Sequence, residues 1–127
     1  MNGFSFKRQS VEEAHFVEHS EIEKKKNIEV GVEGGILIPK DFSKDRTVAV
    51  KLNFHFGQEG DRIVFTLKTT TVFDVDESLG NDIADSKVES ECLPITLAQL
   101  RKTVKNVSEA YGRGPIDLPP FDEENNE

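Results

Sequence analysis

The chain has 127 residues and a mass of 14.3 kDa, which is enough for one domain with an ordinary hydrophobic core. Its net charge of −8 argues against nucleic-acid or anionic-membrane binding, because contacts with phosphate need a basic surface. No stretch is long and apolar enough for membrane insertion, and the first eight residues lack the features of a signal peptide. Cys92 is the single cysteine, which excludes an internal disulfide and a cysteine metal cluster. These features favour a cytoplasmic protein.

The first segment, Phe4–Ser20, supports two interpretations. Phe4 and Phe6 alternate with polar residues, as in a strand. Ser10 and Glu13, however, have the spacing of a helix capping box, and the glutamates here favour a helix. The residues alone therefore leave strand and helix both open.

Asn27–Pro39 is predicted to be the next strand, because its apolar residues alternate. Gly34 and Gly35 indicate either a bulge or a close approach of another backbone. Pro39 is expected to end this strand or to place it at a sheet edge.

The clearest strands are Thr47–Phe56 and Arg62–Val75. The first has an apolar residue at every second position, and the second alternates and is rich in β-branched residues. The residues between them, 57–61, are polar and include two glycines. This pattern predicts an antiparallel hairpin with a longer loop.

A helix is predicted over Pro94–Tyr111. Pro94 suits a first helical position, and Gly112 suits the residue that follows the C-cap. Ser78–Ser90, which precedes the helix, is predicted to be a polar loop. Apolar residues three and four apart form a stripe on one helix face, comprising Leu93, Leu97, Leu100, Val104, Val107 and Tyr111.

Three prolines after the helix favour an extended arm. Ile116, Leu118 and Phe121 give this arm apolar side chains to bury. We expect one domain over residues 1–121 and a disordered acidic tail over residues 122–127.

One short motif suggests enzyme chemistry. His15-Phe16-Val17-Glu18-His19 matches the H-x-x-E-H pattern of inverted zinc peptidases. On a helix both imidazoles could reach one zinc ion, with Glu18 as general base, whereas in a strand they would lie about 13 Å apart. The motif is too short, and the chain too small for a substrate cleft, to favour a peptidase. We predict no metal site.

A cysteine–histidine pair is also disfavoured. Glu89 and Glu91 beside Cys92 should raise the thiol pKa, and His55 lies opposite the apolar row of its strand. We therefore predict that the chain is not an enzyme and needs no cofactor.

Acidic residues gather in two stretches. Residues 74–91 contain seven acidic residues and one basic residue, and residues 117–127 contain five acidic residues and no basic residue. They form either solvated loops and a tail, or a docking surface for a basic partner.

Several short motifs follow the order found in one known family. They are Cys92-Leu93-Pro94, then Arg101, then Arg113-Gly114-Pro115, and then the Leu-Pro-Pro-Phe-Asp of residues 118–122. Near the other end, Phe4-Ser5-Phe6-Lys7-Arg8, the aromatic Phe16 and the Thr47–Val75 hairpin add to the pattern. Together these residues resemble the SecB family of protein-export chaperones.

The resemblance implies an α+β fold, in which a four-stranded antiparallel sheet carries one long amphipathic helix on one face. It favours a strand for Phe4–Ser20. It also implies homodimers or homotetramers, apolar grooves for unfolded or secretory polypeptides, and transfer of these to SecA. The family's second helix is missing, and the arm is shortened. A SecB-like family of uncharacterised Gram-positive proteins is the alternative.

Two functions are therefore expected. One is a holding chaperone or export-linked module, and the other is a SecB-fold scaffold that binds one specific partner. The expected client-binding residues are Phe42, Ile116, Leu118 and Phe121. Glu13, at a family acidic position, and Asp74 and Asp76, by composition, are expected to dock a partner. The expected oligomer interface comprises Ile95, Ala98 and Ala110, which lie off the apolar stripe.

Overall fold

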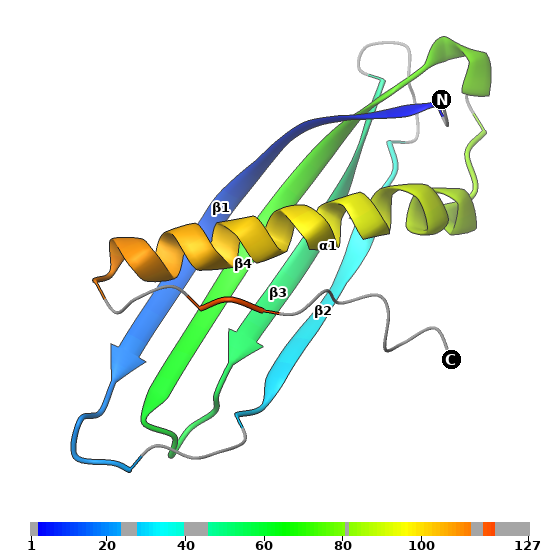
Figure 1. Cartoon of the computed structure of the whole chain (residues 1–127). Helices are drawn as coiled ribbons and strands as arrows, with labels where there is room; N and C mark the ends of the chain where they lie inside the picture. The colour runs from blue at the N-terminus through cyan, green and yellow to red at the C-terminus, as the bar shows by residue number, and fades with distance from the viewer. Residues whose placement is uncertain (1–2, 24–27, 40–45, 81, 113–115, 119–127) are drawn as a thin grey trace.

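The computed structural model describes residues 3–23, 28–39, 46–80, 82–112 and 116–118. Four strands form one antiparallel sheet in the order β1-β4-β3-β2, and one long helix lies across one face (Figure 1). The predicted α+β fold is therefore confirmed. The elements are β1 (Phe4–Glu18), β2 (Val30–Leu37), β3 (Thr47–Phe56), β4 (Ile63–Val75), the short 3-10 helix η1 (Glu77–Leu79) and α1 (Asp85–Ala110).

The predicted hairpin is the centre of the sheet. β3 and β4 pair in antiparallel register, with Val48 opposite Phe73 and Phe54 opposite Leu67. Alternate residues of both strands face α1 and are buried, as the period of two predicted. Burying this row of aromatic and branched side chains is the main stabilising term of the fold.

β1 is a strand and not a helix, and it lies at one edge of the sheet beside β4. Its 15 residues pair with the 13 residues of β4, and the two additional residues form register shifts. These shifts lie between Phe6 and Arg8 and between Val11 and Glu13. Each shift moves the following side chains to the opposite face, so the simple alternation of a strand is interrupted twice.

β2 forms the opposite edge, paired with β3. Of the two explanations offered for its glycines, close backbone approach is correct at Gly34, because a Cβ atom there would collide with the Lys51 carbonyl oxygen. The β2–β3 register runs without a shift. The strand ends at Leu37, two residues before Pro39, which cannot donate a backbone hydrogen bond.

The predicted start of the helix is wrong. α1 begins at Asp85, so Pro94 lies in its interior and much of the predicted loop over Ser78–Ser90 is helical. An interior proline costs a backbone hydrogen bond and about 3 kcal/mol relative to alanine. Val88 and Cys92 offset this cost, because they are buried against the sheet on the turns before the proline.

The buried line of α1 also differs from the predicted stripe. Leu93, Leu97 and Val107 are only partly buried, and Tyr111 is 45% exposed. The buried residues are spaced by four along the helix and include two polar ones. They are Val88, Cys92, Thr96, Leu100, Val104 and Ser108. Gly112 has a positive φ of 80°, as expected for the residue after the C-cap.

In the part of the chain described here, no helix is long and apolar enough to cross a membrane. The acidic tail predicted over residues 122–127 lies outside the described residues, as do Phe42 and Phe121.

Candidate functional site

The face of the sheet opposite α1 is polar and ion-paired. In a bulge, two consecutive side chains point to the same side of the strand. The two register shifts of β1 therefore add Lys7 and Glu12 to this face. Lys7 Nζ lies 3.8 Å from Asp74 Oδ1, and Glu12 Oε2 lies 3.7 Å from the Nζ atom of Lys51 on β3. These exposed pairs contribute little to stability, but they balance the charge of this face.

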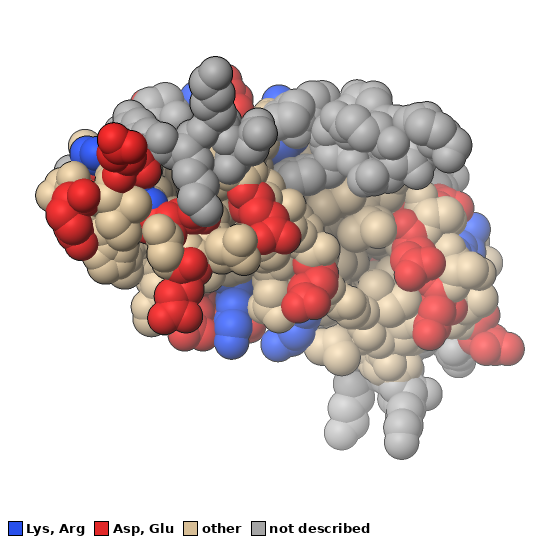
Figure 2. Space-filling view, turned by 90° about the horizontal axis from the view of Figure 1, so that it is seen from below, with Lys and Arg blue, Asp and Glu red and all other residues tan. Residues whose placement is uncertain are grey.

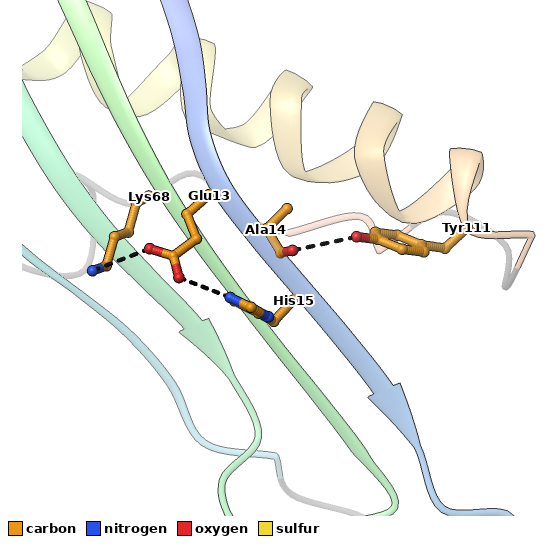
Figure 3. Close-up of polar contacts among 5 residues, drawn as sticks. All are labelled: Glu13, Ala14, His15, Lys68 and Tyr111. Carbon is orange, nitrogen blue, oxygen red and sulfur yellow. Dashed lines mark hydrogen bonds and ion pairs between the residues drawn. The ribbon is translucent and has the colours of Figure 1, made fainter.

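Glu13 is the centre of a small cluster on this face (Figure 3). Its carboxylate lies 2.8 Å from His15 Nε2 and 3.3 Å from Lys68 Nζ. The hydrogen bond with His15 and the contacts with Lys68 lower the pKa of Glu13 below its ordinary value. The residue selected as a docking carboxylate thus has two partners within its own sheet.

The other two docking candidates, Asp74 and Asp76, also have partners. Asp74 pairs with Lys7, as described above. Asp76 caps η1, because its carboxylate accepts a 3.0 Å hydrogen bond from the Ser78 amide, which lowers the Asp76 pKa. Arg46 binds the same corner and donates hydrogen bonds of 2.9 and 2.8 Å to the carbonyl oxygens of Asp76 and Gly80. No feature of the sequence indicated this role of Arg46.

Seen from the lower end of the sheet, acidic side chains are scattered among other residues (Figure 2). They do not merge into one continuous patch in this view. Glu13 lies on β1 and Asp74 lies on β4, whereas Asp76 follows β4 at the end of that strand opposite the hairpin loop. The three docking candidates therefore follow one side of the sheet rather than forming a single cluster.

A shallow depression of about 320 Å³ lies over the middle of this polar face. Two histidines on either side of Thr66, His15 and His55, contribute to its lining together with Glu33 and Lys68. The His55 ring lies against Gly31 of the neighbouring strand, where a Cβ atom would come within 3.0 Å of Nδ1. Polar side chains from all four strands line this depression.

The H-x-x-E-H motif does not form a metal site. His15 lies on the polar face, whereas Glu18 falls in the opposite phase of the strand and binds Arg62 at 3.1 Å. Nowhere in the described ranges do three or more His, Cys, Asp or Glu side chains lie close enough to hold a metal ion. The peptidase geometry requires a helix, and this segment is a strand.

Cys92 faces the sheet from α1 and is fully buried. Burial and the neighbouring Glu91 carboxylate raise the pKa of its thiol to about 12. The predicted direction of the pKa shift is confirmed, with burial as the larger cause. This thiol is a packing group and not a nucleophile.

Residues 116–118, in the arm after α1, run beside the helix over the same face of the sheet (Figure 1). Leu118 belongs to the hydrophobic core, with 6% of its surface exposed, and Ile116 is partly buried against the same core. Ser108 Oγ accepts a 2.9 Å hydrogen bond from the Ile116 amide, and Arg101 Nε donates one of 2.8 Å to the Leu118 carbonyl. The structure therefore brings together Ile116 and Leu118, in a packed position.

The helix flank and the β1 edge carry exposed apolar side chains. Ile95 is 38% exposed, and Ala98 and Ala110 are exposed as well. On the β1 edge, Phe6 is 41% exposed and Val11 is 43% exposed. β1 is a 15-residue edge strand with no further strand beside it in the described residues, and on it the Ala14 carbonyl accepts a 3.5 Å hydrogen bond from the Tyr111 hydroxyl.

A polar network beneath α1 has no signature in the sequence. The side-chain amide of Gln9 donates a 2.8 Å hydrogen bond to Thr71 Oγ1 and a longer one to the Thr96 carbonyl. Thr103 donates to the Gln9 side-chain oxygen at 2.6 Å. Gln9 reaches the helix only because the first register shift of β1 moves it to that face.

No protein-family model matches the sequence, and no curated protein matches it either. Solved structures do match the fold. A SecB-like chaperone of Mycobacterium tuberculosis, Rv1957, superposes with a TM-score of 0.68 over 93% of this chain and 90% of its own. The chain therefore has a SecB-like fold. The two sequences are 11% identical, so the likeness concerns the fold alone.

The Rv1957 structure is a complex with a ChAD peptide from the HigA1 antitoxin. A protein of unknown function from Streptococcus agalactiae also matches, with a TM-score of 0.48 and 16% identity. That match covers 91% of this chain and 96% of the other.

Proposed function

We propose that this chain is a non-enzymatic, SecB-like protein that binds extended polypeptide segments and holds them in an unfolded state. The observation that carries this proposal is the fold match over 93% of the chain to a SecB-like chaperone with a bound peptide. Exposed apolar side chains on both the helix flank and the β1 edge support it, because unfolded segments are held by apolar surface beside free strand edges.

The proposed client-binding region is the arm and its surroundings. Ile116 and Leu118 lie there, and Phe42 and Phe121, outside the described residues, are proposed to contribute to it. Phe121→Ala and Phe42→Ala should weaken client capture with little loss of stability. If both substitutions lower the melting temperature sharply while client capture is unaltered, these phenylalanines are core residues instead.

The test of holding activity is suppression of aggregation. Several unrelated proteins are unfolded in denaturant and diluted into buffer with and without the chain, and light scattering is followed. A holding chaperone should suppress scattering for most of them at near-stoichiometric ratios. Absence of suppression for every client contradicts this function.

A second candidate is a scaffold for one specific partner. It is supported by the peptide bound to the M. tuberculosis chaperone, which comes from a single named antitoxin. A pull-down followed by mass spectrometry separates the two. One dominant, stoichiometric partner together with no general suppression of aggregation would favour the scaffold.

We also propose a homodimer or homotetramer whose interface includes Ile95, Ala98 and Ala110. The β1 edge leaves backbone groups that a second copy can pair with. Light scattering at tens of micromolar should give an oligomer, and Ile95→Asp should shift it toward monomer. Lys102→Asp, at an exposed position of the same helix, is the matched control. A wild-type monomer at this concentration contradicts the proposal.

Partner docking through Glu13, Asp74 and Asp76 is proposed for a basic partner, with SecA as the candidate in a cytoplasmic setting. Docking of this kind should weaken with added salt, because it depends on exposed charges. Reversing the three residues to lysine should abolish it. Unchanged affinity after that reversal would rule out these residues as the docking site.

A further inference from the structure

The arm after α1 has the features of a bound peptide. Ile116 is half-buried, Asp117 is exposed and Leu118 is buried, which is the alternation of an extended segment with one side against the core. No part of residues 116–118 belongs to the sheet. Residues 116–118 therefore pack against the core in the way that a separate, extended peptide would.

The contacts that hold this segment are to its backbone. The Ile116 amide donates to Ser108 Oγ at 2.9 Å, and the Leu118 carbonyl accepts from Arg101 Nε at 2.8 Å. Ser108 is buried and Arg101 is half-buried on α1, and the seven residues between their positions correspond to about two helical turns. Side chains that bind backbone groups select an extended conformation and leave the sequence of the bound segment open.

The apolar contacts of the site determine which side-chain pattern a bound segment needs. Leu118 is 6% exposed and belongs to the core cluster, and Ile116 packs against the same cluster. A segment that fits here needs apolar side chains two positions apart, with a polar side chain tolerated between them. Such segments are common in unfolded chains, because every amphipathic strand contains them.

We propose that this seat, formed by α1 and the core beside Arg101 and Ser108, is the site at which an extended apolar polypeptide binds, and that residues 116–118 occupy it as a built-in competitor. The inference rests on the proposed function and adds its location and its regulation. A client binds by displacing the arm. The arm then reduces apparent affinity by the fraction of time that it is in place.

The arm has the advantage of being tethered. A short tether gives an effective concentration in the millimolar range, so only clients that offer better apolar contacts displace it. The seat is then covered when no client is present. This arrangement keeps the apolar surface from promoting aggregation of the protein itself.

The test uses arm-side substitutions, because they vacate the seat and leave its walls intact. The probe is a fluorescein-labelled synthetic peptide with the sequence of residues 113–121, added to the full-length chain. Leu118→Ser should tighten binding of this peptide about tenfold or more, because the competing arm is weakened. Leu79→Ser in η1 is the matched control, since Leu79 is also partly buried against the core and does not belong to the arm. It should leave the affinity unchanged.

The proposal is overturned if the peptide binds Leu118→Ser and the wild type with equal affinity. It is also overturned if Leu79→Ser binds the peptide as much more tightly than the wild type as Leu118→Ser does. Hydrogen exchange on the wild-type chain gives a measurement that does not depend on a variant. The Ile116 amide should be protected in the free chain and should lose protection when the peptide saturates it. Continued protection at saturation places the peptide elsewhere and overturns the proposal.

The outcomes also separate this inference from the proposed function. If the chain suppresses aggregation while the Ile116 amide stays protected, holding activity stands and the displacement of the arm is wrong. If clients and peptide bind only to Leu118→Ser, the arm is confirmed as a competitor. If neither the wild-type chain nor Leu118→Ser binds clients or peptide, the proposed holding activity and the displacement of the arm are both wrong.

Discussion

The Thr103 hydroxyl of α1 donates a 2.6 Å hydrogen bond to the side-chain oxygen of Gln9 on β1. The same glutamine side chain donates to Thr71 on the neighbouring strand. One amide therefore joins the helix, the edge strand and a central strand. Apolar contacts are not directional, whereas these hydrogen bonds determine where along β1 the helix lies.

Gln9→Ala should lower the free energy of unfolding by about 1–3 kcal/mol, because it leaves the hydroxyl groups of Thr71, which is buried, and Thr103, which is half-buried, without this partner. Chemical denaturation measures the change. Ser10→Ala is the control, since Ser10 is an exposed neighbour on the same strand. If the two variants unfold at the same denaturant concentration, the network does not stabilise the fold.

Pro94→Ala should stabilise the protein. The proline lies at an exposed position in the interior of α1, where it removes one backbone hydrogen bond to the preceding turn. Restoring that bond should raise the free energy of unfolding by up to about 3 kcal/mol. Thermal unfolding by circular dichroism provides the measurement, with Asn106→Ala as a control at another exposed position of the helix. A lower melting temperature for Pro94→Ala would show that the proline is required.

The pKa of Glu13 should rise when its partners are removed. Its carboxylate is held below the ordinary pKa by hydrogen bonds with His15 and Lys68. His15→Ala should therefore raise it, as should Lys68→Ala, in a carbon-13 NMR titration of the carboxyl group. Because the folded-state pKa is the lower one, the contribution of the cluster is present above the unfolded-state pKa. It is lost as the pH falls through the folded-state value.

His55→Ala is the control for this titration. His55 lines the same depression as Glu13, but neither the Glu13 hydrogen bonds nor its ion pairs involve it. An unchanged Glu13 titration in His15→Ala would contradict the assignment of His15 as the main cause.

Cys92 should resist alkylation while the protein is folded. Its thiol is fully buried, and its pKa of about 12 leaves almost no thiolate at pH 8. Iodoacetamide should therefore modify it slowly in native buffer and rapidly in denaturant, as followed by mass spectrometry. Modification at similar rates under both conditions would show that α1 separates readily from the sheet.

The alternation of apolar residues and the strand propensities were sufficient to predict the central β3–β4 hairpin of the fold. The β3–β4 hairpin has one uninterrupted alternation, and its buried face follows from the sequence directly. The start of α1 could not be predicted, because Pro94 is a strong local signal for a first turn. The burial of Val88 and Cys92, which depends on the sheet, overrides that signal.

The candidate site was predicted only in part. The apolar residues of the arm could be identified from Ile116 and Leu118, since apolar residues in a proline-rich segment need a surface to bury them. Arg101 and Ser108 could not be assigned as its backbone partners, because hydrogen bonds between a side chain and a distant main chain leave no periodic pattern. Ser108 moreover occupies a buried position at which an apolar residue is the usual choice.

The two register shifts of β1 also determine which changes of length the strand tolerates. Removal of Lys7 alone would close the first shift and leave Phe4 and Gln9 on the face that they occupy now, and removal of Glu12 alone would do the same for Val11 and Ala14 at the second shift. Removal of both residues would give a strand as long as β4, with Phe4 and Phe16 still facing the helix. Homologous chains are therefore expected to gain or lose residues here at the shift positions, as insertions and deletions that leave the aromatic ends of the strand in place.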